Sequence, residues 1–89
     1  MKAIITILGK DKVGIIASVS TSLAKQNVNI LDITQTVMKE YFTMTMLVDL
    51  EKLETEFIVL QEELTNIGRE LQMDIRIQRE DIFVKMYEI

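Results

Sequence analysis

Apolar residues recur with two different periods along this chain, and the first change of period lies near its beginning. The run from Lys2 to Leu8 is rich in β-branched residues, which is typical of a buried strand. From Ile15 to Ala24 the apolar residues recur at helical spacing instead. The beginning of the chain therefore predicts a strand followed by a helix.

A β-hairpin is predicted next, after the helical pattern breaks at Asn27–Asn29. Apolar and polar residues alternate between Ile30 and Val37, and again between Phe42 and Val48. The polar pair Lys39–Glu40 separates the two runs. Two extended runs with so short a joint are typical of adjacent antiparallel strands. One face of the first run carries Leu31, Ile33 and Val37.

The second half of the chain predicts a helix, a strand and a short tail. Apolar residues step by three and four positions from Phe57 to Leu71. Gly68 is either the C-terminal stop of this helix or a close-packing point inside it, and the apolar phase that continues to Leu71 favours the second role. A fourth strand alternates from Met73 to Gln78. Glu80 and Asp81 then favour the N-terminus of a short C-terminal helix. The apolar residues of this tail are Ile82, Phe83, Met86, Tyr87 and Ile89.

The order strand, helix, strand, strand, helix, strand predicts an α+β fold of the ferredoxin-like βαββαβ kind. Right-handed crossovers place both helices on one face of a four-stranded antiparallel sheet. The opposite face then carries threonines, charged residues and a few aliphatic side chains, and it meets water or a partner. We expect the methionines to pack in the core, namely Met38, Met44, Met46, Met73 and Met86.

Composition limits the chemistry that the chain can perform. Eighty-nine residues with three glycines and no proline form a single domain, residues 1–89, and so small a core favours help from a partner chain. The absence of cysteine and histidine excludes thiol nucleophiles, imidazole acid–base chemistry, and thiolate or imidazole metal sites. We therefore expect neither an enzyme nor a bound cofactor or metal.

Charge and hydropathy bear on partners and location. Ten basic against fourteen acidic residues give a net charge of −4, whereas nucleic-acid binding demands a basic surface. No apolar run approaches the roughly 20 residues that cross a bilayer, and the N-terminal run is too short for a secretory signal. We therefore expect a cytoplasmic protein that binds neither nucleic acid nor membrane. The acidic residues of the second half are typical of a solvated helix face: Glu51, Glu54, Glu56, Glu62, Glu63 and Glu70.

Three segments carry a resemblance to a known family. They are the turn Gly-x-Asp-x-x-Gly-Ile-Ile at positions 9–16, the helix end Leu-Ala-Lys-Gln-Asn at positions 23–27, and Val-Asn-Ile-Leu-Asp-Ile at positions 28–33. Together with the order of the remaining elements, they resemble the ACT domain family, most closely the small stand-alone bacterial ACT proteins and the regulatory modules of glycine-cleavage-type repressors. Members of the family bind small effectors, commonly amino acids, at interfaces between ACT domains, and they regulate an attached or partner enzyme.

The resemblance implies both a site and a partner. Two domains set side by side extend one sheet into a homodimer and bring the first turn and the start of the second strand together. The N–H groups near Gly14 suit the carboxylate of a free amino acid, and Asn29 or Asp32 suits its ammonium. Many family members are fused to a catalytic or DNA-binding domain, and since this chain carries neither, the protein that it regulates is undefined. The implied ligand-binding residues are Lys10, Asp11, Lys12, Val13, Gly14, Ile15, Asn29, Ile30, Leu31 and Asp32.

Other interpretations of the same residues stay open at this stage. Gly14 serves either the close approach of a ligand or the geometry of the turn alone. Asp11 is better explained as a helix cap than as a ligand contact. Lys10 and Lys12 attract an anion or are simply solvated. Asn29 either binds an effector or turns the chain into the strand.

Competing functions on the same fold lack their site residues. An acylphosphatase-like hydrolase needs an arginine in the first loop, where this chain has lysines. A phosphate-binding P-loop needs Lys and Ser or Thr where Ile15 and Ile16 stand, and an RNA-binding sheet needs aromatic residues on its middle strands. The remaining alternative is a protein-interaction module, a homodimer that docks on an enzyme or regulator without a small ligand.

Overall fold

A computed structural model describes residues 1–10 and 14–82 of the chain. Its helices and strands follow the order that the sequence predicts. They are β1 (Lys2–Lys10), α1 (Ile15–Lys25), β2 (Asn29–Met38), β3 (Tyr41–Asp49), α2 (Phe57–Leu71) and β4 (Asp74–Arg79).

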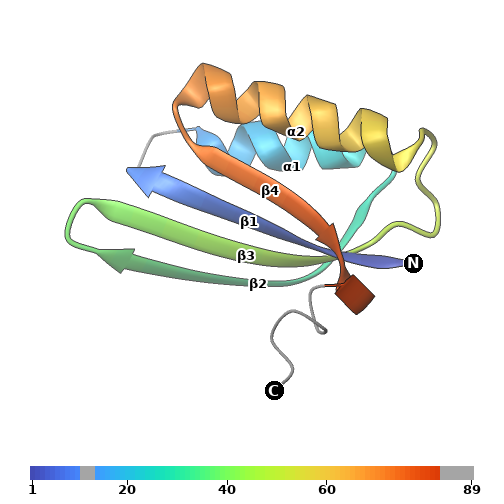
Figure 1. Ribbon diagram of the computed structural model, residues 1–89, viewed down its shortest axis with the longest axis horizontal. Coiled ribbons are helices and arrows are strands. Elements are labelled where there is room, and N and C mark those ends of the chain that lie inside the picture. The colour runs from blue at the N-terminus through green and yellow to red at the C-terminus, as the bar shows by residue number, and fades with distance from the viewer. Residues whose placement is uncertain (11–13, 83–89) are drawn as a thin grey trace.

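The four strands form one antiparallel sheet in the order β2-β3-β1-β4. β3 and β1 are the central strands, and β2 and β4 are the two edges. Figure 1 shows α1 and α2 side by side on one face of this sheet. The predicted α+β, ferredoxin-like βαββαβ fold is thus confirmed.

The core lies between the sheet and the two helices. Alternate positions of β1 and β3 are buried, as the period of two along a strand requires. The helices turn their apolar stripes toward the same layer. Buried residues of β1, α1, β3 and α2 and of the segment from Met73 through β4 form one cluster, and Ile30 of β2 packs against it. The largest side chains with less than 2% exposure are Ile5, Ile7, Val19, Leu23, Met44, Met46, Val48, Leu60 and Leu64.

Three of the methionines predicted to lie in the core are buried, but the prediction for Met38 is wrong. Met44 and Met46 on β3 are buried, and so is Met73 just before β4. Met38 is 69% exposed because it pairs with the exposed Tyr41, on the face of the sheet opposite the helices. Side chains alternate between the two faces of a strand, so the neighbouring Val37 lies on the helix side and Met38 does not. Met86 lies outside the described residues.

Gly9 and Gly68 both make room for Met73. A Cβ atom at Gly68 would lie 2.7 Å from the backbone oxygen of Met73, so the helix would have to move away from the chain that follows it. Gly68 is therefore a close-packing point inside α2, as predicted. Gly9 belongs to β1, and a Cβ atom there would overlap the sulfur of Met73. Packing within the chain explains this first glycine.

A hydrogen-bonded polar group ties the two helices to the loop before α2. Glu63 on α2 accepts hydrogen bonds from Ser22 Oγ at 3.0 Å and from the side-chain amide of Gln26. The side-chain oxygen of Gln26 in turn accepts from Thr55 Oγ1 at 2.6 Å. Ser22 and Gln26 are buried. The prediction that Glu63 belongs to a solvated acidic face is therefore wrong, because its carboxylate is the shared acceptor of this group.

Replacing Glu63 by alanine is expected to destabilise the domain by about 1–3 kcal/mol, because the buried donors of Ser22 and Gln26 lose their acceptor. Urea unfolding followed by circular dichroism measures the effect. The matched control is Glu62→Ala, an exposed neighbour on the same helix, which should stay within about 0.5 kcal/mol of the wild type. Equal losses in the two variants would contradict a structural role for Glu63.

The two edges of the sheet differ in charge. On β4, Arg76 pairs with Asp74 at 3.1 Å, and Arg79 pairs with Asp81 just beyond the strand at 3.0 Å. Exposed charges along an edge strand disfavour pairing with another chain. The ten residues of β2 include a single charged one, Asp32. An additional strand is therefore accommodated better at β2 than at β4.

The predicted C-terminal helix is described only at its start. Residues 80–82 are helical, and the prediction for residues 83–89 lies outside the described residues. Within residues 1–10 and 14–82, no helix combines the length and the apolar character that crossing a membrane requires.

Candidate functional site

The turn between β1 and α1 contains the first predicted ligand-binding segment. Gly14 directly precedes α1 with φ of 92° and ψ of −6°, in the left-handed region. Residues with a side chain are strained at such a φ, so the geometry of the turn by itself requires glycine here. A Cβ atom at Gly14 would meet nothing within 4 Å, so the space beside it is open. Turn geometry and close approach of a ligand are thus compatible at this position.

The side chains of this segment offer less to a ligand than its backbone does. Ile15 is 2% exposed and belongs to the core. Lys10 Nζ lies 3.7 Å from Glu40 Oε2, and both side chains are more than half exposed, so this ion pair contributes little. No side chain of the described residues caps the N-terminus of α1. Three predicted residues lie outside the described ones, and with them the predicted cap: Asp11, Lys12 and Val13.

The second predicted segment opens the edge strand β2 and contains a β-bulge. Ile30 pairs with Val48 and Asp32 with Leu47, which leaves Leu31 without a partner on β3. Asp32 Oδ1 accepts a hydrogen bond from the N–H of the next residue at 2.9 Å. Leu31 is 43% exposed. Bulges interrupt a ladder and redirect side chains, and they often occur next to binding sites.

The two segments lie at opposite ends of the sheet. Lys10 pairs with Tyr41 at one end, whereas Asn29 pairs with Asp49 at the other. Asp49 also pairs with Lys2, at the beginning of β1. The eight residue steps from Lys2 to Lys10 span about 26 Å at about 3.3 Å per residue. One copy of the chain therefore does not place both segments around one small molecule.

The edge strand β2 carries two apolar side chains that no helix of the described residues covers. Ile33 and Val37 lie opposite Met46 and Phe42 of β3, on the face of the sheet that the helices cover. They are nevertheless 43% and 59% exposed, because α1 and α2 lie over the other strands, as Figure 1 shows. The sequence placed the two residues on one face correctly. On that face of the sheet, the side chains of β3 are buried, whereas Ile33 and Val37 of β2 are exposed.

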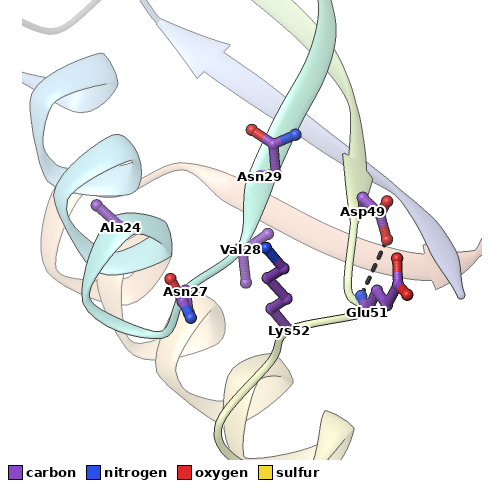
Figure 2. A pocket seen from close by; sticks show the side chains of 7 residues that line it. All are labelled: Ala24, Asn27, Val28, Asn29, Asp49, Glu51 and Lys52. Carbon is purple, nitrogen blue, oxygen red and sulfur yellow. Dashed lines mark hydrogen bonds between the residues drawn. The ribbon is translucent and has the colours of Figure 1, made fainter.

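A cavity of about 570 Å³ opens beside Asn29. It lies between the C-terminal end of α1, the start of β2 and the loop after β3 (Figure 2). Figure 2 shows Lys52 extending from that loop toward Val28, with the carboxylates of Asp49 and Glu51 to one side. The Glu51 N–H donates to Asp49 Oδ1 at 2.9 Å, which holds the two residues together. The lining residues are Ala24, Asn27, Val28, Asn29, Asp49, Glu51 and Lys52.

A family model of the ACT domain matches residues 2–78. The chain belongs to the ACT domain family. Relatives of this ACT domain include a UPF0237 protein of Clostridium acetobutylicum, which is 54% identical over 89 residues, or 100% of both chains. The solved structure of an ACT domain protein from Streptococcus pneumoniae is 47% identical, has a TM-score of 0.80, and matches over 93% of each chain. ACT domains are generally regulatory, ligand-binding domains, and the predicted resemblance is confirmed.

A more distant neighbour of this ACT domain bears on the resemblance to repressor modules. A protein described as a glycine cleavage system transcriptional repressor is 24% identical and has a TM-score of 0.72. The likeness covers 88% of this chain and 44% of that chain. At such an identity it shows a shared fold alone.

The sequence singled out only one residue of the cavity in this ACT domain as a ligand contact, Asn29. Asn27 was interpreted as part of a helix break, and its φ of 62° agrees with that role. Glu51 was assigned to the solvated acidic group, and Lys52 was not singled out. A signal was nevertheless present, because counting back along the hairpin from the Lys39–Glu40 turn brings Asn29 beside the end of the third strand.

Proposed function

We propose that this ACT domain is a non-enzymatic, cytoplasmic sensor that binds an amino acid or a similar small metabolite between two copies of the chain. The observation that carries the proposal is the placement of the two predicted segments at opposite ends of one sheet. The edge strand β2 of this sheet exposes Ile33 and Val37, which no helix within residues 1–10 and 14–82 covers. A second copy paired along that edge brings the turn of one chain toward the bulged segment of the other.

Antiparallel pairing of two β2 strands about a two-fold axis supports this arrangement. Two-fold dimers are the commonest homo-oligomers, and in them the start of one β2 lies beside the end of the other. That end, Met38, pairs with Tyr41, which pairs with Lys10 at the turn. Three strand spacings of about 4.8 Å each separate the turn from the start of the second copy's β2, so the two lie about 14 Å apart. A small metabolite and the side chains around it span that distance.

The chemistry of the two segments suits the two ends of an amino acid. The N–H groups at the N-terminus of α1 favour a carboxylate, and the open space at Gly14 leaves room for its approach. The side-chain oxygen of Asn29 and the carboxylate of Asp32 are acceptors for an ammonium. Asp32 uses one oxygen for the N–H of Ile33 and keeps the other for a ligand.

Thermal unfolding in the presence of each of the twenty amino acids tests the proposal. An effector at a hundred times its dissociation constant stabilises the folded state by about 2.7 kcal/mol, and we expect at least one amino acid to raise the melting temperature by several degrees. No shift with any of the twenty would contradict the sensor. That outcome would favour the protein-interaction module instead, whose partner is then sought by a pull-down from cell extract.

A further inference from the structure

The cavity beside Asn29 is built by one chain and has an unusual set of charges. Its lining combines two carboxylates, one lysine and two carboxamides, contributed by Asp49, Glu51, Lys52, Asn27 and Asn29. At about 570 Å³ it falls within the range of small-molecule sites. Among the described residues, Lys52 takes part in no ion pair. Its ammonium is therefore available to a ligand.

The electrostatic character of the cavity favours a cation overall. Asp49 and Glu51 together outweigh the single positive charge of Lys52. The last turn of α1 adds to this, because Ala24 lies in it and lines the cavity, and the C-terminal end of a helix carries partial negative charge. The α1 helix has 11 residues, long enough for this contribution. Two ammonium groups and one carboxylate on a ligand would complement the charges of the lining.

We propose that this cavity is a second binding site, made within one chain, for a small molecule with two ammonium groups and one carboxylate, which is the charge pattern of a basic amino acid. Lys52 receives the carboxylate, while Asp49 and Glu51 receive an ammonium. The amides of Asn27 and Asn29 supply further hydrogen bonds, since each offers both a donor and an acceptor.

This site goes beyond the proposed function because it needs no second copy of the chain. The sensor at the β2 edge depends on pairing with a second copy of the chain and on the turn at Gly14. Neither the exposed edge residues Ile33 and Val37 nor Gly14 lines the cavity. Asn29 is shared by the two sites. The variant Ile33→Glu with Val37→Glu, which places charges on the edge of β2, separates them: it removes the interface and leaves every residue of the cavity in place.

Calorimetric titration of the full chain with three probes tests the charge pattern. Lysine carries all three groups, cadaverine lacks the carboxylate, and norleucine lacks the side-chain ammonium. We expect lysine to bind at least about tenfold more tightly than either analogue, because each missing group leaves a charged partner unused. Equal affinity for the three probes, or no binding of lysine at millimolar concentration, would overturn the proposal.

Substitutions with matched controls locate the binding. Asp49→Asn keeps an oxygen for the Glu51 N–H and removes the charge, and Lys52→Ala removes the ammonium; each is expected to weaken lysine binding about tenfold. The controls are Glu40→Gln and Lys39→Ala in the turn between β2 and β3, at the other end of the sheet. Lysine should also bind the Ile33→Glu, Val37→Glu variant undiminished. If the controls lower the affinity as much as Asp49→Asn and Lys52→Ala do, or if the edge variant no longer binds lysine, the ligand does not occupy this cavity.

Discussion

The combined substitution Ile33→Glu and Val37→Glu is expected to convert a dimer into a monomer and to abolish effector binding at the interface. Two-fold pairing of β2 sets the new carboxylates of one copy near those of the other, and like charges on facing strands oppose pairing. Within one copy the substitution removes little packing, because both side chains are at least 43% exposed. Sedimentation equilibrium measures the mass, and calorimetry measures the binding.

The control for this edge variant is Ile58→Glu on α2. Ile58 is an apolar residue with 51% exposure, similar to that of the two edge residues, and it lies away from β2. We expect this control to remain dimeric and to bind the effector like the wild type. A wild type that is monomeric, or an edge variant that stays dimeric, would show that β2 is not the interface. Pairing along β2 would then not bring the two predicted segments into contact with the same ligand molecule.

The fold was predictable from the sequence because each element buries one face, and burial imposes a period on the apolar residues. The second helix shows this well, since its observed bounds, Phe57–Leu71, are the ones that its apolar stripe predicts. The end of the first strand was not predictable from the apolar pattern. Pairing with β3 continues through Gly9 to Lys10, beyond the last apolar residue of the run. The backbone hydrogen bonds of a strand do not depend on apolar side chains, so the apolar pattern does not predict the last residues of this strand.

The parts that the sequence did not predict depend on which elements become neighbours. Ile33 and Val37 share a face of the sheet with the buried Met46 and Phe42, yet they are at least 43% exposed, because they lie on the edge strand β2 beyond the cover of the helices (Figure 1). Glu63 resembles its exposed neighbour Glu62 in sequence, yet Ser22, which is 41 residues away, donates to it. The cavity likewise joins residues from α1, β2 and the loop after β3. None of these contacts is local along the chain, so no short motif encodes them.

The turn was easier to predict from the sequence than these distant contacts, because a positive φ depends on the residue at one position. The glycine at position 14 was expected to serve turn geometry or ligand approach, and the φ of 92° establishes the first role. The second role stays a prediction. Separating the two roles requires substitutions that both place a Cβ atom at this φ and that differ in the bulk placed beside the turn.

Gly14→Val is expected to abolish effector binding and to leave the dimer intact, whereas Gly14→Ala should retain much of the binding. Both variants place a Cβ atom at the same φ, which costs alanine about 1–3 kcal/mol of folding free energy, and valine more because it is β-branched. Apart from its chain neighbours, a Cβ atom there meets none of the described residues within 4 Å, so the two methyl groups of valine add bulk to the space beside the turn in which the proposed ligand lies. Melting temperature, sedimentation and calorimetry are measured on both variants, with the amino acid that gives the largest shift in the thermal screen.

The difference in affinity between the two variants distinguishes backbone strain from the approach of a ligand. If strain alone mattered, valine and alanine would lower the melting temperature and the affinity together. If a ligand approaches the backbone at the turn, valine should reduce the affinity on the order of a hundredfold, equivalent to roughly 2.7 kcal/mol, and alanine by less than about tenfold. Equal binding by Gly14→Val and the wild type would place the effector elsewhere, and the open space beside Gly14 would then be a consequence of turn geometry alone.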